Sequence, residues 1–269
     1  MTRFSAVGVG HVGLVRANNE DSGFAGQACL LVADGVGGNA AGEVASATAA
    51  YVVSASVLAR PGADPLDVLG TAARLAQEQV RVGVREDPRR AGMATTLTAV
   101  VSDGERFALL HVGDSRGYLF RDGVLHRITS DHTFVQQLVD DGSLSPQDAR
   151  THPWRNVVLR SLDGNVLETG DLTELDLQVG DRVLLASDGL SDLVTDDHVA
   201  AVLARHGDEA AADVLVEAAL RAGGRDNVTC VLGTLVDGEP VTGDGILLGA
   251  ARDPRIVVDP AAVRLPRSA

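Results

Sequence analysis

The stretch that most constrains this chain runs from Cys29 to Glu43 and reads CLLVADGVGGNAAGE. It begins as an apolar run typical of a buried strand, breaks at Asp34-Gly35 into a glycine-rich loop, and continues after Ala40 with a helical pattern. A carboxylate therefore follows a buried strand, beside backbone that few side chains shield. Burying an aspartate costs free energy unless a partner compensates its charge. We expect that partner to be a divalent cation.

The dipeptide Asp-Gly is not specific by itself, and the chain contains its own comparison. Asp103-Gly104 and Asp122-Gly123 each join two strand-like runs, which is typical of two-residue hairpin turns. Asp34-Gly35 and Asp188-Gly189 are instead followed by a loop and then a helical pattern. The latter two are candidates for chemistry, provided that other carboxylates join them.

The composition excludes several classes of function. A net charge of -14 over 269 residues argues against nucleic acid or an anionic membrane as a partner. The chain contains no lysine, which a P-loop NTPase, a protein kinase, a Schiff-base enzyme and a pyridoxal enzyme each require. Cys29 and Cys230 lie in apolar runs and are expected to be buried free thiols, as in a reducing, cytoplasmic setting. There is no signal-peptide pattern, and no apolar run approaches the roughly 20 residues that span a bilayer.

Two polar motifs near the N-terminus allow more than one interpretation. Gly8 to Gly13 reads as G-x-G-x-x-G, but the residues that follow, LVRANNEDSGF, predict no helix, so we do not expect a dinucleotide site there. Arg16 to Asp21 lies between two predicted strands. It is either a solvated turn or an acid pair beside a phosphate-binding guanidinium.

The apolar patterns predict strands and helices along most of the chain. Asp64 with Pro65 behind it marks a helix start, and glycines mark several helix ends. The polar, turn-rich residues 130–160 are predicted to form a flap over one face, and residues 237–269 a loosely structured tail without chemistry. Strands are predicted at 3–9, 29–33, 93–101, 106–112, 182–187 and 228–236, a hairpin at 118–128, and helices at 40–60, 65–85, 131–141, 195–205 and 208–221.

Four aspartates flank apolar strand-like runs: Asp34, Asp114 and Asp188 each follow one, and Asp226 precedes one. If these runs lie side by side in sheets, the four carboxylates can meet at one end. Carboxylates packed together repel one another and mostly protonate unless a cation compensates them. Oxygen-only ligands favour Mg²⁺ or Mn²⁺ over zinc. Two such ions, about 3.5–4 Å apart, can activate a shared water against phosphorus.

Six motifs follow one another along the chain: VRANNED, ADGVGG with AAGEVAS behind it, MATTLTAV, HVGDSRGY, ASDGLSD and GRDNVT. Their order is the one seen in type 2C metal-dependent serine/threonine protein phosphatases, and the chain resembles the bacterial single-domain members most. The resemblance covers about residues 5 to 236. It implies an α+β fold, a four-layer α/β/β/α sandwich of two antiparallel sheets flanked by helices, with one catalytic domain over residues 1–236.

The resemblance also implies the metal ligands. Two ions, Mn²⁺ or Mg²⁺, are expected to bind tightly in a cleft at one end of the sandwich, and a third more weakly. Asp34 is expected to bridge the tight pair, with Asp188 and Asp226 completing the protein ligands of the first ion. The Gly35 carbonyl is expected to serve the tight pair, and Glu20 to reach the second ion through water.

The remaining implied roles concern the third ion and the substrate. Asp114 is expected to bind the third ion, together with Asp188 and Asp192. Arg16 is expected to hold the phosphate. Asn39 stands where bacterial relatives usually carry histidine, which removes a candidate proton donor to the leaving oxygen, and Ala94 replaces a common glycine.

The function predicted from these residues is hydrolysis of phosphoserine and phosphothreonine in proteins by a metal-bridging hydroxide, with Arg16, Asp34, Asp188 and Asp226 as the catalytic set. Phosphorylated proteins, including serine/threonine kinases, are the expected partners of a monomeric, cytoplasmic enzyme. Two alternatives stay open. One is a metal- and phosphopeptide-binding regulatory module with weak turnover, and the other is a phosphatase for a small metabolite.

Overall fold

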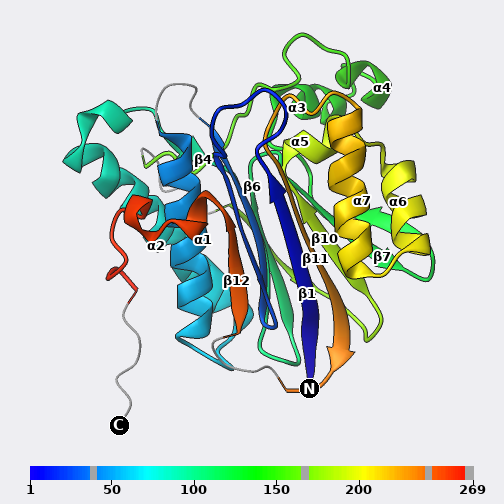
Figure 1. Ribbon diagram of the computed structural model, residues 1–269, viewed down its shortest axis with the longest axis horizontal. Coiled ribbons are helices and arrows are strands. Elements are labelled where there is room, and N and C mark those ends of the chain that lie inside the picture. The colour runs from blue at the N-terminus through cyan, green and yellow to red at the C-terminus, as the bar shows by residue number, and fades with distance from the viewer. Residues whose placement is uncertain (37–40, 165–169, 240–243, 264–269) are drawn as a thin grey trace.

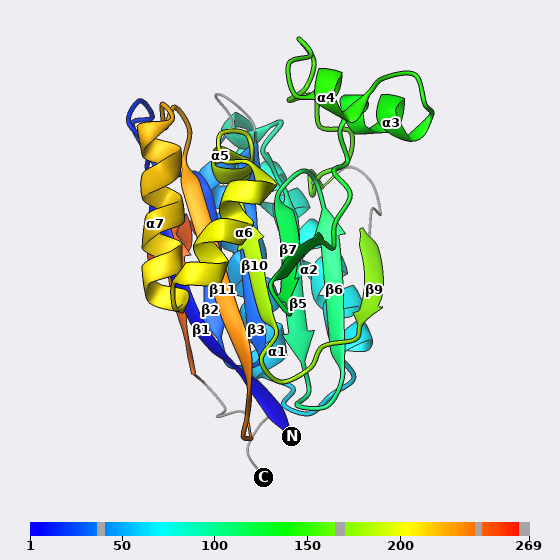
Figure 2. The ribbon, with the colours of Figure 1, turned by 90° about the vertical axis from the view of Figure 1, so that its right-hand side faces the viewer.

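The structure is a computed structural model that describes residues 1–36, 41–164, 170–239 and 244–263. Two antiparallel sheets pack face to face, and helices cover the outer face of each sheet (Figures 1 and 2). This confirms the α+β sandwich expected from the sequence. In the described part of the chain, no helix combines the length and the apolar character that crossing a membrane requires.

The first sheet has five strands, and β1 and β8 are its edges. The strand order is β1 (Thr2–His11), β11 (Val228–Asp237), β10 (Arg182–Ala186), β7 (Arg116–Arg121) and β8 (Val124–Arg127). In the second sheet the order is β12 (Gly245–Gly249), β2 (Asp21–Gly26), β3 (Cys29–Val36), β5 (Leu97–Ser102), β6 (Phe107–Val112) and β9 (Asp171–Leu175), and β4 (Ala94–Thr95) also pairs with β3.

Two long helices lie on each side of the sandwich. α1 (Gly42–Leu58) and α2 (Pro65–Glu86) cover the second sheet, and α6 (Asp196–Arg205) and α7 (Asp208–Arg221) cover the first. Asp64 caps α2 as predicted, because its side chain accepts hydrogen bonds from the N–H groups of Leu66 and Asp67. The short elements are α3 (Phe134–Asp140), α4 (Pro146–Ala149), α5 (Asp188–Ser191) and the 3₁₀ helices Pro88–Arg90, Ala250–Arg252 and Pro254–Ile256.

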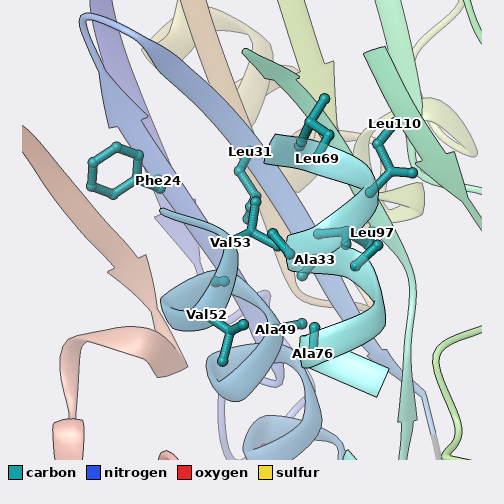
Figure 3. Packing of buried hydrophobic residues seen from close by; sticks show 14 of the residues in the cluster. Phe24, Leu31, Ala33, Ala49, Val52, Val53, Leu69, Ala76, Leu97 and Leu110 are labelled. Atoms are coloured by element: carbon teal, nitrogen blue, oxygen red, sulfur yellow. The ribbon is translucent and has the colours of Figure 1, made fainter. Parts of the chain in front are cut away.

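The alternation of side chains along β3 determines the direction of the Asp34 carboxylate. Its first five residues are buried on both faces. Leu31 and Ala33 pack toward the helices, as Figure 3 shows, whereas Leu30 and Val32 pack between the two sheets. Because side chains alternate along a strand, Asp34 continues the face of Leu30 and Val32. The carboxylate is therefore directed to the end of the space between the sheets.

The structure differs from the sequence prediction in its C-terminal part. Residues 237–269 were expected to form a loosely structured tail, but β12 pairs with β2 over five residues, and Leu248 is buried between the sheets. Ala251 and Val257 join the core beneath α1. The prediction is therefore wrong for residues 245–258. A five-residue strand bounded by glycines is too short to show a clear hydrophobic period.

Two further strands were mispredicted. β9 was missed because nearly all of its residues are exposed, so that the strand has no apolar face to reveal it. The strand predicted over 93–101 is divided into β4 and β5 at Thr96. The predicted flap holds α3 and α4, which stand off the end of the sandwich where α5 lies (Figure 2).

Candidate metal centre

The four predicted aspartates lie at the same end of the sandwich, near enough for their charges to act on one another. Asp34 comes from β3 and Asp114 follows β6 in one sheet, while Asp188 follows β10 and Asp226 precedes β11 in the other. Burial raises the pKa of Asp34 well above its usual 3.8, and the charges of Asp21, Asp188, Asp114 and Asp226 raise it further. The structure thus brings together a set of acids that are widely separated in the sequence.

The predicted ligands of the weaker ion form one side of this cluster. Burial, and then the charges of Asp131 and Asp192, raise the pKa of Asp114 to about 7. Burial raises the pKa of Asp188 well above its usual value, and Asp114 and Asp192 are its strongest acidic neighbours. Asp114, Asp188 and Asp192 also line one cavity of about 310 Å³ beneath the flap. They are therefore neighbours, as predicted.

Asp21 is a buried acid that the site prediction omitted in favour of Glu20. It lies directly opposite Asp34 in the β2–β3 ladder and is 1% exposed. Its Oδ2 accepts a hydrogen bond from the Ser187 hydroxyl at 2.8 Å, whereas its Oδ1 has no partner among the described residues. Burial raises the pKa of Asp21 to about 6. The signal in the sequence was its place as the first residue of a strand that is buried throughout.

Glu20, predicted to reach the second ion, lies beside Gly35, predicted to lend its carbonyl to the tight pair, at the start of α1. The Gly35 N–H donates to the Glu20 carbonyl at 3.1 Å. A Cβ added at Gly42 would lie 2.8 Å from Glu20 Oε2 and 2.9 Å from the Gly35 carbonyl oxygen. The two oxygens therefore converge on the same glycine, and burial with the nearby Glu43 raises the pKa of Glu20.

Thr96 joins the loops that carry Asp34 and Asp114. Its hydroxyl accepts a hydrogen bond from the Asp34 N–H at 2.9 Å and lies 2.8 Å from the hydroxyl of Ser115. Its backbone N–H donates to the Asp34 carbonyl at 2.9 Å. Thr96, which lies between β4 and β5, therefore holds the backbone of Asp34 close to Ser115, the residue after Asp114.

Asn227 is a positioning residue that the sequence analysis overlooked. Its side-chain amide donates to the carbonyls of Val12 and Asn18, each at 2.9 Å. Its Oδ1 accepts a hydrogen bond from the Glu20 N–H at 2.7 Å, and Asn227 is only 4% exposed. Asn227 thus ties the loop that carries Arg16 and Glu20 to the loop that carries Asp226. In the sequence it resembles an ordinary turn asparagine.

Arg16 lies at the edge of the cluster. Its Nη2 is 2.8 Å from Asp226 Oδ2, and both side chains are a little over 40% exposed. The hydrogen bond to Asp226 raises the pKa of Arg16, and Glu20 and Asp34 add to the effect. The guanidinium is therefore beside the carboxylates and open to solvent, where an anionic ligand can reach it.

The donor set fits hard divalent cations. It consists of oxygens only, it concentrates negative charge in a buried place, and Asp21 Oδ1 lacks a partner there. In the described ranges, no three acidic, histidine or cysteine side chains already close on one point. An ion would therefore complete its coordination with the Gly35 carbonyl and with water, as Mg²⁺ commonly does.

The two departures noted in the sequence have different outcomes. Asn39 lies outside the described residues. Ala94 is 8% exposed in β4, where it pairs with Val36. Its methyl group is therefore accommodated in the strand without displacing β3.

Comparison with known proteins places the chain among the phosphatases. The family model described as protein phosphatase 2C matches residues 16–222. A serine/threonine protein phosphatase PstP of Mycobacterium tuberculosis is 47% identical over 238 residues, which are 88% of this chain and 46% of that protein. The chain thus spans about half the length of this relative.

One further relative and one solved structure match over nearly their whole length. The serine/threonine phosphatase stp of Listeria monocytogenes is 33% identical over 82% of this chain and 91% of its own. The crystal structure of the catalytic domain of PstP in complex with two manganese ions superposes with a TM-score of 0.83 at 43% identity, covering 88% of this chain and all of the other. With both its sequence and its fold matched in this way, the chain belongs to the protein phosphatase 2C family.

Proposed function

We propose that this chain is a metal-dependent phosphatase that removes phosphate from phosphoserine and phosphothreonine in proteins. The observation that carries the proposal is the gathering of partly buried carboxylates from both sheets beside the open guanidinium of Arg16. A pair of divalent ions supplies Lewis acidity toward phosphoryl oxygens and makes a water nucleophilic at neutral pH. The manganese ions in the related catalytic domain support that assignment.

The roles of the side chains follow from their positions. Asp34, Asp188 and Asp226 would hold the first ion, and Asp34 would share the second with the Gly35 carbonyl and, through water, with Glu20. Asp114, Asp188 and Asp192 would hold the third ion. These residues surround the end of the space between the sheets, so the phosphoryl group would be bound at the mouth of the cleft, within reach of Arg16.

The extent of the domain and its setting are also part of the proposal. We assign the catalytic domain to residues 1–236, with β12 added at the edge of the second sheet and residues 130–160 as a flap facing the substrate. Both cysteines are buried and free, which agrees with the reducing cytoplasm, and we propose that the protein works there as a monomer. Serine/threonine kinases are among the proposed substrates.

Replacing Arg16 tests its contact with phosphate. A guanidinium can donate to two phosphate oxygens at once, and such charge-assisted bonds are among the stronger hydrogen bonds in proteins. We expect Arg16→Ala to raise KM for a phosphothreonine peptide about tenfold, the equivalent of about 1.4 kcal/mol. The affinity of the Arg16→Ala variant for Mn²⁺ should change much less than its KM for the peptide. Steady-state kinetics with Arg74→Ala, an exposed arginine of α2, provides the control, and an unchanged KM in Arg16→Ala would show that Arg16 is a surface residue.

Replacing Asp114 tests the weaker metal site. Asp114 lies on the side of the cluster formed with Asp188 and Asp192. We therefore expect Asp114→Asn to slow turnover while two tightly bound Mn²⁺ ions remain. Isothermal titration calorimetry would count the ions. Loss of the tight pair in this variant would place Asp114 in the central cluster instead.

The proposed reaction is tested with a panel of substrates. The wild-type protein would be incubated with Mn²⁺, with Mg²⁺ or with EDTA, and release of phosphate would be measured. The panel contains a phosphothreonine peptide, an autophosphorylated serine/threonine kinase, an aryl phosphate and a set of phosphorylated metabolites. We expect metal-dependent turnover of the peptide and the kinase. Turnover of a metabolite alone would favour the metabolite phosphatase, and binding of the peptide without turnover of any substrate would favour the regulatory module.

A further inference from the structure

The base of the flap is held together by backbone hydrogen bonds between its two arms. The Phe134 N–H donates to the Val157 carbonyl at 2.9 Å, and the Leu159 N–H donates to the His132 carbonyl at 2.7 Å. His132 therefore belongs to the joint through which the flap meets the domain. Its side chain is only 9% exposed, so it faces inward rather than toward solvent.

His132 is bonded on its inner side to the residue directly before Asp114. The Gly113 N–H donates to His132 Nδ1 at 3.1 Å, and the His132 N–H donates to the Gly113 carbonyl at 2.8 Å. Gly113 has a φ of +106°, and a Cβ there would lie 2.5 Å from Thr96 Cγ2. Because Gly113 packs closely against Thr96, its position can vary little. Its two hydrogen bonds to His132 therefore determine where the backbone of the Asp114 loop starts.

On its outer side His132 meets an ion pair from the other arm and from β9. His132 Nε2 lies 3.0 Å from Asp171 Oδ2, and Arg160 Nη1 lies 2.8 Å from Asp171 Oδ1. Because Nδ1 accepts from Gly113, the ring proton of the neutral imidazole is on Nε2, where it donates to Asp171. Arg160, also 2.9 Å from Nε2, is then held through the carboxylate rather than by the ring.

His111 supports the ring of His132 from behind. The two ring centroids are 4.8 Å apart, and His111 is 2% exposed. Burial, together with His132, lowers the pKa of His111 to about 4, so its ring is neutral at physiological pH. Its Nε2 lies 3.0 Å from the Ser130 carbonyl and its Nδ1 lies 2.9 Å from the Thr98 hydroxyl. The imidazole of His132 is thus fixed in position as well as in tautomer.

From these contacts we infer that His132 is a positioning residue that couples the flap to Asp114. The two nitrogens of one ring bind the two parts: Nδ1 binds the backbone before Asp114, and Nε2 binds the Asp171–Arg160 pair at the flap's second arm. A flap that moves as a unit therefore shifts the Asp114 loop and alters the weak metal site. The inference rests on the proposed function only for the assignment of the weak ion to Asp114.

Two substitutions separate the two bonds of the ring. The amide of an asparagine reaches the position of Nδ1, and that of a glutamine reaches the position of Nε2. His132→Gln should therefore lose the bond to Gly113 and keep the one to Asp171, and His132→Asn should do the reverse. His126→Gln, which changes an exposed histidine of β8, is the matched control.

The test measures metal binding and flap mobility without turnover. In a calorimetric titration with Mn²⁺, the Kd of the weak site should be about tenfold higher in His132→Gln than in the wild type, which is equivalent to about 1.4 kcal/mol of binding free energy. The Kd values of the tight pair should not change. His132→Asn should restore the weak site toward the wild-type affinity. Hydrogen exchange of residues 134–157 should be faster in His132→Asn, which loses the bond to the Asp171–Arg160 pair, than in His132→Gln or in the His126→Gln control.

Other outcomes would overturn the inference. These are a weak site unchanged in His132→Gln, a loss shared equally by tight and weak sites, or a wild-type titration without a weak site. If His132→Gln does not fold, His132→Asn still decides, because it must keep the weak site while exchange at the flap increases. Failure of the proposed phosphatase activity would appear in the substrate panel and would leave these binding results intact.

Discussion

Replacing Asp34 by asparagine is expected to abolish turnover and, in the same protein, to raise the melting temperature of the metal-free form. Asp34 is the predicted ligand of both tight ions, so we expect turnover to fall at least about 10³-fold, or about 4 kcal/mol of transition-state stabilisation. Asp188→Asn should behave alike. In EDTA, removing one of the repelling carboxylate charges stabilises the fold. The melting temperature should rise by roughly 2–4 °C for each kcal/mol of repulsion removed.

The sign of the stability effect follows from the raised pKa of Asp34. An acid whose pKa is higher in the folded than in the unfolded state destabilises the fold when it is ionised. That cost is complete at a pH above the folded-state pKa and disappears as the pH falls toward the unfolded-state value. The advantage of Asp34→Asn in EDTA should therefore be largest at alkaline pH and shrink on acidification.

The measurement is thermal unfolding of both proteins across pH, with EDTA and with Mn²⁺. Mn²⁺ should stabilise the wild type strongly and Asp34→Asn little, because a ligand stabilises only in proportion to its binding to the folded state. Asp213→Asn, an exposed residue of α7, carries the same change of charge and should alter neither property. Retained turnover in Asp34→Asn, or equal melting temperatures in EDTA at alkaline pH, would contradict the expected role of Asp34.

Adding a single methyl group at Gly189 is expected to damage both the fold and the metal centre. A Cβ there would lie 1.9 Å from the Asn227 carbonyl oxygen. Asn227 cannot easily move away, since its side chain is bonded to Val12, Asn18 and Glu20. The loops of Asp188 and Asp226 must therefore separate. We expect Gly189→Ala to lower the free energy of unfolding by about 3 kcal/mol, the upper part of the usual range for overpacking.

Chemical denaturation and Mn²⁺ titration would measure the two effects of Gly189→Ala. The control is Gly207→Ala at the start of α7, because a Cβ there meets nothing within 4 Å. It should lower the free energy of unfolding by about 1 kcal/mol or less, the usual cost of an alanine at an N-cap. If Gly189→Ala were as stable as Gly207→Ala and bound Mn²⁺ normally, the close approach of these two loops would not be needed for the site.

The comparison of Asp-Gly pairs shows why much of the site was predictable. Asp122-Gly123 forms the expected two-residue turn between β7 and β8, and Asp103 lies in the β5–β6 hairpin, where four residues rather than two separate the strands. Asp34 lies near the end of β3 and Asp188 directly follows β10, and in the structure the two carboxylates are neighbours. A carboxylate at the end of an apolar run is a local pattern, so the sequence contains it.

The missed features are those that depend on contacts between distant segments. The role of Asn227 consists of bonds to residues more than 200 positions away, which no local pattern predicts. The same is true of Asp21, whose partner Ser187 follows β10 of the other sheet. β9 and β12 were missed because short edge strands form by pairing with a neighbour rather than by burying an apolar face.

The central claim is that divalent ions bind among Asp34, Asp188 and Asp226, and anomalous X-ray scattering tests it most directly. Crystals of the wild-type protein grown with Mn²⁺ would be measured at the manganese absorption edge. We expect two strong anomalous peaks in the cleft, both within coordination distance of Asp34, one of them also beside Asp188 and Asp226 and the other beside the Gly35 carbonyl. An anomalous map without a peak at Asp34 would contradict the metal centre and, with it, the proposed phosphatase mechanism.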